Sequence, residues 1–407
     1  MNGKERNALL HDAISQMGLD ALVCALPKNV LMLSGYWPVV GTSIAIAFSD
    51  GTVHLIVPED ERELAQNGWA KHVATFKPGS LESITTAAEA VVAPLRRLEG
   101  QFAAGARVGI EHGEESEPSS YAAMHLYGGS LSRALKRALP KTNPVLADGL
   151  IRKLQAIKTE TELGRVRTSC ALTGEAFEQA SKQLHVGITE IAAAELYRAQ
   201  FRVSQAGYSG VQRTEAFFFV MSGANSAKAH GAYARSRAKQ LGDGDLLLVH
   251  CNTCADGYWT DVTRTYSIGR PDDQRNQMYA AIFAAREAAF QAIAPGEKAA
   301  DVDRAARSVL HDRGFGKEFK HSTGHGVGFD AISANALPRI HPKSPDILEP
   351  GMVFNIEPAI YIDGFGGIRH CDMVVVTESG YELLTDFQTG MADLFLTSGQ
   401  ADSAQSA

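Results

Sequence analysis

Five side chains that can bind a metal ion or move a proton lie in four short segments of this 407-residue chain. The segments read LLLVHCNTCADGYWTDVTRT, HSTGHGVG, MVFNIEPAIY and GGIRHCDMVVV, and the side chains are His250, Asp261, His325, Glu357 and Cys371. A polar side chain within a buried apolar run is costly unless it has a partner. The four segments therefore predict one shared site that contains all five side chains.

The wording and order of these segments resemble the creatinase/aminopeptidase P/prolidase family, the M24 peptidases with the pita-bread fold. The resemblance extends over almost the whole chain, from PKNVLMLSGY to GYELLT. In the family's peptidases two aspartates, a histidine and two glutamates hold two metal ions. Three positions match this set: Asp261 precedes VTRT, His325 lies in Gly-His-Gly and Glu357 lies in Ile-Glu-Pro.

The other two positions depart from the family pattern. His250 stands where the family has its first aspartate, and Cys371 stands where it has its last glutamate. Two ions roughly 3.5–4 Å apart need bridging anionic oxygens to offset their repulsion. We therefore expect a remodelled site in which the five side chains hold one divalent ion. Zinc or iron is favoured over manganese because a thiolate is a softer donor.

Three further side chains resemble groups that bind substrate or handle protons in the family. His230 matches a histidine upstream of the first ligand strand, His321 lies four residues before His325, and Arg369 lies beside Cys371. A histidine that titrates near neutrality suits general acid–base catalysis. The family's peptidases have another histidine where this chain has Ile332, so we expect a poor Xaa-Pro peptidase.

The resemblance implies a hydrolase of a carbon–nitrogen bond in a small molecule or short peptide. The alternative is a metal-independent hydrolase, similar to creatinase or ectoine hydrolase. In that case His230 would move the proton, Glu357 would hold a cationic or urea-like group, and Cys371 could act as a nucleophile. A non-catalytic binding module is the third hypothesis. It is the least favoured because the polar set is retained.

Composition excludes some classes of partner. Net charge is -7, with acidic and basic residues interspersed, so neither nucleic acid nor an anionic membrane is an expected partner. The N-terminus lacks the apolar core of a signal peptide, and the expected location is cytoplasmic. Five cysteines, an odd number, predict free thiols rather than a disulfide framework.

The patterns predict two domains and a tail. Residues 1–155 alternate helical patterns with short apolar runs, which favours an α/β domain. Residues 156–396 are expected to form the α+β pita-bread catalytic domain, a curved antiparallel sheet covered by helices with the site on its concave face. Residues 397–407 are small and polar and are predicted to be a mobile tail.

Local signals place the first ligand strand. Asp256-Gly257 predicts a hairpin turn between two strands. Because side chains alternate across a strand, His250 and Cys254 share one face while Cys251 points to the other. The Cys251-x-x-Cys254 spacing therefore indicates two structural cysteines.

An aromatic pair is expected to reach the site from a second subunit. Tyr36 and Trp37 lie in a Gly/Pro-flanked loop, and aromatic side chains are enriched at interfaces. The resemblance implies a homodimer in which this loop contacts substrate in the partner's site.

Overall fold

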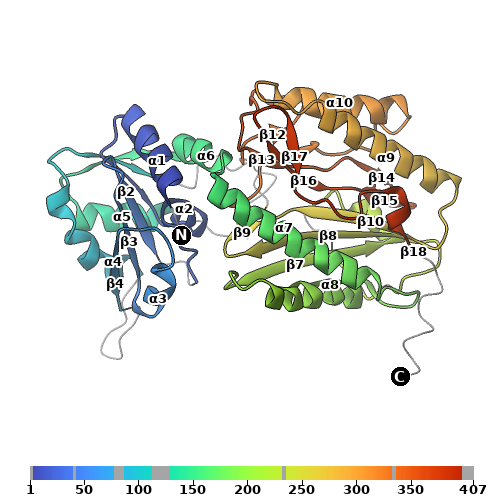
Figure 1. Cartoon of the computed structure of the whole chain (residues 1–407), viewed down its shortest axis with the longest axis horizontal. Coiled ribbons are helices and arrows are strands. Elements are labelled where there is room, and N and C mark those ends of the chain that lie inside the picture. Colours follow the sequence, from blue (N-terminus) through green and yellow to red (C-terminus); the bar gives the residue numbers. More distant parts are fainter. Residues whose placement is uncertain are drawn as a thin grey trace. The chain divides into compact units, whose positions relative to one another are not determined.

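The computed structural model describes residues 3–39, 43–77, 87–111, 128–231, 235–331 and 336–396 (Figure 1). The chain divides into two compact units, residues 1–161 and 162–407. Ile332 and the proposed tail, 397–407, lie outside the described residues. Within the described part, no helix is both long and apolar enough to cross a membrane.

The first unit is built on a six-stranded mixed sheet in the order β4-β3-β2-β1-β5-β6. Helices α4 and α5 contribute apolar side chains to the core cluster that covers the strands, including Leu95 and Leu135. The short apolar runs ALVCAL, SIAIAFSD and TVHLIV of this unit, which predict strands, contain β1, β2 and all but the last residue of β3. The elements are β1 (Ala21–Cys24), β2 (Ile44–Phe48), β3 (Val53–Pro58), β4 (His72–Phe76), β5 (Arg107–Ile110), β6 (Asn143–Leu146), α1 (Lys4–Gln16), α2 (Pro27–Ser34), α3 (Arg62–Ala65), α4 (Ala87–Arg96), α5 (Gly128–Ala138) and α6 (Asp148–Ala156).

The second unit combines several small, mostly antiparallel sheets with helices α7 to α10 among its described residues; the pair β10-β18 is parallel. Its largest sheet has the order β18-β10-β8-β7, with β9 paired to β8. The other sheets are β13-β16-β17, β14-β15 and β11-β12. The elements are α7 (Glu160–Ser181), α8 (Glu190–Ser204), β7 (Thr214–Ser222), β8 (Leu246–Ala255), β9 (Tyr258–Trp259), β10 (Val262–Ile268), α9 (Asp273–Gln291), α10 (Ala299–Asp312), β11 (Gly324–His325), β12 (Arg339–Ile340), β13 (Val353–Ile356), β14 (Ala359–Ile362), β15 (Gly366–Arg369), β16 (Asp372–Val376), β17 (Tyr381–Leu383) and β18 (Phe395–Leu396).

The predicted hairpin after the first ligand strand is confirmed. Asp256 and Gly257 have φ angles of 49° and 89°, and Ala255 pairs with Tyr258. Two consecutive residues with positive φ define the tight turn that matches the twist of the flanking strands. Asp256 tolerates this conformation because its carboxylate accepts hydrogen bonds from the backbone N–H groups of Gln212 and Arg213.

One face of the β7-β8-β10 sheet packs against helices, and the opposite face carries the predicted site residues. On β8, Thr253 Oγ1 lies 2.6 Å from Thr173 Oγ1 of α7. On β7, the Phe218 ring packs against Tyr197 of α8. Side chains alternate along a strand, so His250 must face away from these helices. The α7 helix crosses this sheet in Figure 1.

The strand pair that carries Glu357 and Cys371 is interrupted at both residues. β13 and β14 are separated by Glu357-Pro358, and β15 and β16 by His370-Cys371. Ile356 pairs with Asp372 and Ala359 with Arg369, so the two interruptions lie opposite each other. Proline has no N–H to donate to a ladder. Glu357 and Cys371 therefore lie at one break in the paired strands, where their backbone N–H groups bond to other segments.

Candidate active site

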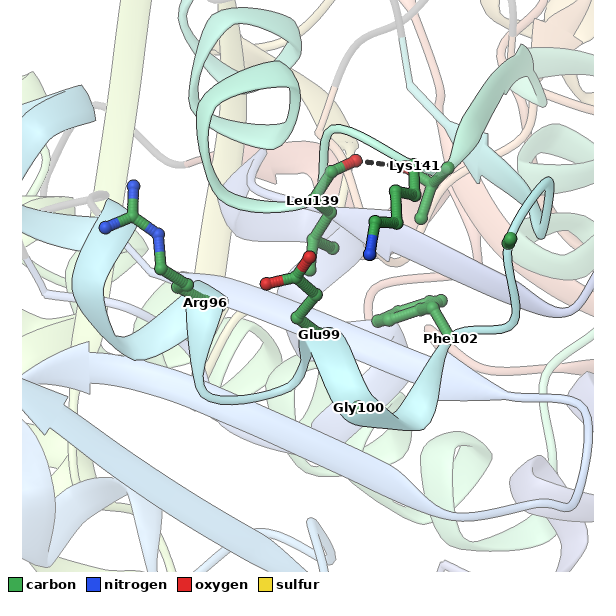
Figure 2. A pocket seen from close by; sticks show the side chains of 8 residues that line it. Arg96, Glu99, Gly100, Phe102, Leu139 and Lys141 are labelled. Atoms are coloured by element: carbon green, nitrogen blue, oxygen red, sulfur yellow. Dashed lines mark hydrogen bonds between the residues drawn. The ribbon is translucent and has the colours of Figure 1, made fainter.

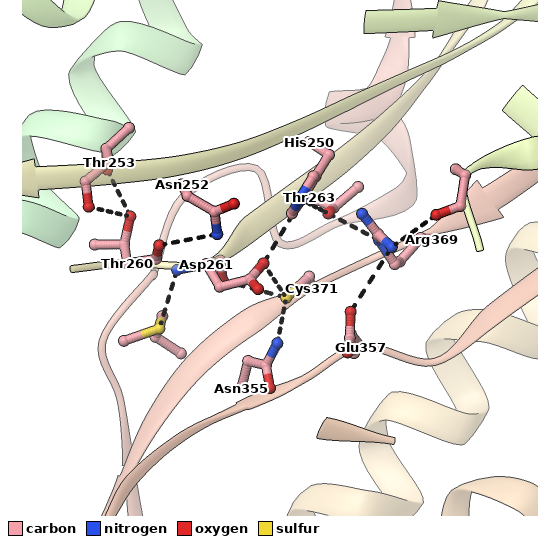
Figure 3. A network of polar contacts seen from close by, with 12 residues as sticks. His250, Asn252, Thr253, Thr260, Asp261, Thr263, Asn355, Glu357, Arg369 and Cys371 are labelled. Atoms are coloured by element: carbon pink, nitrogen blue, oxygen red, sulfur yellow. Dashed lines mark hydrogen bonds and ion pairs between the residues drawn. The ribbon is translucent and has the colours of Figure 1, made fainter. Parts of the chain in front are cut away.

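Asp261 lies at the centre of a buried cluster on the face of the sheet away from α7 (Figure 3). Its Oδ2 is 3.4 Å from His325 Nε2, and its Oδ1 is 3.6 Å from His250 Nδ1. Cys371 Sγ is 3.7 Å from the same Oδ1 and donates to the Asp261 carbonyl oxygen at 3.2 Å. Four of the five side chains predicted from the sequence are therefore brought together around one carboxylate.

Asp261 and His325 form a buried ion pair. Burial alone would raise the pKa of Asp261, but the charges of His250 and His325 outweigh it and lower the pKa to about 2. Burial alone would lower the pKa of His325, yet the contact with Asp261 raises it to about 9. His325 Nδ1 lies 3.1 Å from the Gly326 carbonyl oxygen, which can only accept, so this nitrogen carries a proton and Nε2 faces Asp261.

Glu357 and Arg369 form the second charged pair. Arg369 Nη1 is 3.8 Å from Glu357 Oε2, and both side chains are buried. Burial raises the pKa of Glu357 to about 7, although the charge of Arg369 opposes this effect. Arg369 is held by Thr263 Oγ1, which accepts from Nε at 2.9 Å. Glu357 is therefore a carboxyl group that can exchange a proton near neutral pH.

His250 is a neutral imidazole in this environment. Burial, with the charge of Arg369, lowers its pKa to about 4. Its Nδ1 lies 3.1 Å from Thr263 Oγ1, and its ring stacks on Phe219 of the neighbouring strand. Thr263 thus links His250 to Arg369, a connection that the sequence pattern did not reveal.

Cys371 is a protonated thiol rather than an activated nucleophile. It is fully buried, and burial together with the charge of Asp261 raises the pKa of the thiol well above its usual value. A nucleophilic cysteine needs the opposite, a lowered pKa and access to substrate. The suggestion that Cys371 attacks the substrate therefore receives no support from its surroundings.

Asn355 and Tyr361 join the cluster and were missed by sequence reasoning. Asn355 Oδ1 accepts from the His325 backbone N–H at 2.7 Å, which turns its Nδ2 toward Cys371 Sγ, 3.6 Å away. The Tyr361 hydroxyl lies 3.0 Å from His321 Nε2 and 3.4 Å from Arg369 Nη1. Both residues lie in the apolar strands on either side of Glu357, at even spacings from it. The alternation of side chains along a strand could therefore have placed them on the same face as Glu357.

His321 and His230 lie at the edge of this cluster. His321 Nδ1 lies 2.7 Å from the Ser322 carbonyl oxygen, so its Nε2 accepts from Tyr361. Burial lowers the pKa of His321 to about 3, and the ring is neutral. His230 is exposed, and its ring centroid lies 5.5 Å from that of Tyr361. Burial of part of its ring, with the charge of Lys320, lowers the pKa of His230.

Tyr36 and Trp37 belong to the first compact unit. Tyr36 is buried, and its hydroxyl donates to Glu61, which also accepts from the Val39 backbone N–H at 2.9 Å. Trp37 is half-buried. Glu61 therefore fixes the conformation of this loop within its own unit.

A cavity of about 600 Å³ lies elsewhere in the first unit (Figure 2). Arg96, Glu99, Phe102 and Lys141 are among the side chains that line it. It contains none of the side chains predicted to act chemically, and we assign it no role.

The donor set does not fit the two ions of a dinuclear centre. A neutral imidazole and a protonated thiol stand where bridging or chelating carboxylates are required. Within the described residues, no group of three or more His, Cys, Asp or Glu side chains is arranged to hold a metal ion. Each distance given above joins Asp261 to only one other side chain, and the distances involve both of its carboxylate oxygens.

The mixed α/β fold and the buried carboxylate–imidazole cluster define a class of hydrolase. Residues 164–378, just over half of the chain, match the model of Metallopeptidase family M24. The chain therefore belongs to this family, which confirms the resemblance drawn from its four segments. The peptidases of this family generally use divalent metal ions.

Two relatives show how far the likeness extends. The chain is 39% identical over 239 residues to the probable dipeptidase PepE of Mycobacterium tuberculosis, covering 58% of this chain and 60% of that protein. It is 28% identical over 386 residues to the Xaa-Pro dipeptidase of Pyrococcus furiosus, covering 94% and 98%. The match thus spans about 60% of the length of PepE, and the activity of this chain is a proposal.

Solved structures support the same fold over nearly all of the chain. The prolidase of Pyrococcus horikoshii superimposes with a TM-score of 0.74 at 26% identity, covering 94% of this chain and 99% of that chain. The Xaa-Pro dipeptidase of Bacillus anthracis gives a TM-score of 0.77 at 23% identity, covering 97% and 100%, a likeness of fold alone.

Proposed function

We propose that this chain hydrolyses an amide-like carbon–nitrogen bond in a small substrate, with residues 156–396 as its pita-bread catalytic domain. One observation carries the proposal. The His325–Asp261 ion pair, at 3.4 Å, and the Glu357–Arg369 pair, at 3.8 Å, occupy the same buried cluster, in which the pKa of the Glu357 carboxyl is raised to about 7 and that of the His325 imidazole to about 9. General acid–base catalysis near neutral pH requires a base and an acid whose pKa values are separated in this way.

The side chains have complementary tasks in this reaction. The Glu357 carboxylate accepts a proton from water as the water oxygen attacks the carbonyl carbon. Arg369, held by Thr263 and Tyr361, stabilises negative charge on the carbonyl oxygen. The His325 imidazolium donates its proton to the leaving nitrogen as the carbon–nitrogen bond breaks. Proton exchange with solvent then restores both groups.

Dipeptides are the first substrates to test, because the relatives are a probable dipeptidase and Xaa-Pro dipeptidases. We propose that Xaa-Pro dipeptides themselves are poor substrates. His250 and Cys371 replace the anionic ligands on which a two-ion site depends. Small amides without proline, including urea-like compounds, belong in the same panel.

A single-ion version of this hydrolase is the second candidate. The ligands of one four-coordinate ion, bound at 2.0–2.3 Å, lie about 3.3–3.7 Å from one another. Asp261 lies 3.4, 3.6 and 3.7 Å from His325, His250 and Cys371, each within this range, but among the described residues no three such side chains surround one point, so this candidate requires the side chains to rearrange around the ion. Zinc or iron is the expected ion because Cys371 is a soft donor.

The deciding experiment combines metal analysis with a base variant. Protein purified without added metal is assayed on the panel before and after chelation, and its metal content is measured. We expect hydrolysis that survives chelation and is lost in Glu357→Gln but retained in the control Glu382→Gln, whose side chain pairs with Arg167 away from the site. Stoichiometric metal, with activity lost on chelation, would instead establish the single-ion candidate. Equal activity of the two variants would refute the role of Glu357.

A further inference from the structure

Two stacked aromatic side chains form an apolar surface near the cluster. The rings of Phe217 on β7 and Trp259 on β9 are nearly parallel, with centroids 6.1 Å apart and an interplanar angle of 12°. Phe217 is 50% exposed, and Trp259 is half-buried. A large aromatic side chain left half in water beside a polar site is a feature to be explained, since such side chains usually bury their apolar area.

Strand register places this pair on the same face as His250. Phe219 lies opposite His250 and stacks on its ring, with centroids 5.9 Å apart. Phe217 lies opposite Asn252, two residues farther along β8, and Trp259 lies opposite Cys254. Since strands rise about 3.4 Å per residue, the surface begins about 7 Å from His250. It extends the polar cluster rather than standing apart from it.

The backbone fixes the position of this surface relative to the reacting groups. Trp259 is two residues before Asp261, and its N–H donates to the Gly328 carbonyl oxygen at 2.6 Å. Gly328 is three residues after His325. Trp259 is therefore fixed relative to both members of the buried ion pair. It precedes Asp261 in the chain, and its backbone is hydrogen-bonded to the loop that follows His325.

We propose that Phe217 and Trp259 form the subsite for a bulky apolar side chain of the substrate. This inference rests on the proposed function, since it names the class of substrate for the same site: dipeptide-sized amides with a large apolar group near the scissile bond. One extended residue spans about 3.3–3.6 Å, so a side chain one or two residues from the scissile bond reaches the pair. Glu215, on the same face of β7, makes a cationic side chain the competing occupant.

The side chains between the two rings favour the apolar occupant. Asn252 and Cys254, which lie on β8 between Phe217 and Trp259, are uncharged and buried. An apolar group laid on the exposed area of Phe217 and Trp259 removes apolar surface from water on both partners without leaving a buried charge unpaired. Glu215 lies opposite Cys254, level with Trp259, but it is exposed, and an ion pair in water contributes little to binding.

Direct binding tests the subsite independently of hydrolysis. The chain has three tryptophans, so the emission change that is lost in Trp259→Phe reports binding at this surface. We expect Phe-Pro to change this emission and to bind about tenfold more tightly than Gly-Pro, a factor typical of one apolar side chain in a pocket. Lys-Pro is the cationic probe and should bind no better than Gly-Pro.

Phe217→Ser should remove the preference for Phe-Pro while leaving the affinity for Gly-Pro unchanged. Val203→Ser is the matched control, since Val203 is an exposed apolar residue on α8, 66% exposed, away from the site. Equal affinity for Phe-Pro and Gly-Pro in the unmodified protein, or a preference for Lys-Pro, would overturn the proposal. Preferential binding of Phe-Pro without hydrolysis of any panel member would uphold the subsite and refute the proposed function.

Discussion

Replacing Asp261 by asparagine should move the pKa of His325 by more than two pH units. In the unmodified protein the contact with Asp261 raises the pKa of His325 to about 9 against the effect of burial. Asparagine keeps the shape of the side chain but removes the charge. Burial then acts without its main counterweight, and we expect the pKa of His325 to fall below its ordinary value of about 6.5.

The magnitude follows from the two shifts. The raised pKa of His325 corresponds to about 3 kcal/mol and the lowered pKa of Asp261 to about 2 kcal/mol, at about 1.4 kcal/mol per pH unit. Both values describe one ion pair and are not added, so the pair stabilises the folded state by about 2–3 kcal/mol. Because the folded pKa of His325 is raised, this stabilisation is complete below pH 6.5 and is lost as pH rises through 9. On the acid side it is lost as pH falls through 2, the lowered pKa of Asp261.

Histidine NMR of the whole protein measures this pKa directly. Thirteen histidines are present, and the His325 resonance is assigned from its absence in His325→Gln. Asp256→Asn, which removes a carboxylate at the β8-β9 turn, is the control and should leave the pKa of His325 unchanged. A His325 resonance that does not titrate between pH 5 and 10 until a chelator is added would show that a metal ion occupies Nε2. That outcome refutes the ion-pair reasoning.

Three further predictions concern rate, substrate and assembly. The acid limb of kcat/KM against pH should fall near pH 7, the pKa of Glu357, because its carboxylate is the active form; a limb that persists unchanged in Glu357→Gln would exclude it as the base. Turnover of Xaa-Pro dipeptides with added manganese should be far below that of a prolidase, and Cys371→Glu combined with His250→Asp should raise it; rapid turnover by the unmodified protein would contradict this. Homodimers that share sites should regain activity when Trp37→Ala and His325→Ala chains are mixed, whereas mixtures that never exceed the sum of the two mutants despite proven subunit exchange would contradict shared sites.

The sequence predicted which side chains belong to the cluster, but it did not predict their protonation states. His250, Asp261 and Cys371 could be grouped because each interrupts an apolar run in the order of a known family. Their protonation depends on distances across strands that are far apart in the sequence, such as the 3.7 Å between Cys371 Sγ and Asp261 Oδ1. The thiol of Cys371 is held in its neutral form by burial, which a motif does not record.

Local signals were most reliable where the backbone conformation is set by the residue itself. The turn at Asp256-Gly257 was predicted because a two-residue turn with positive φ favours these residue types. Tyr361 and Asn355 escaped notice because a tyrosine or asparagine in a strand usually has only a structural role. Their contributions to the site depend on one neighbour each, His321 Nε2 and the His325 backbone N–H.

The interruption of the paired strands at Glu357-Pro358 and His370-Cys371 connects the fold to the chemistry. In a continuous ladder, residues 357 and 371 would be held by their own strand partners. Instead the Glu357 N–H donates to the Thr323 carbonyl oxygen at 2.8 Å, and the Cys371 N–H donates to the Thr263 carbonyl oxygen at 3.0 Å. Main-chain hydrogen bonds donated by residues 357 and 371 thus extend to the segment before His325 and to the strand after Asp261. Glu357 and Cys371 are therefore positioned by main-chain hydrogen bonds, which substitution of either side chain leaves intact.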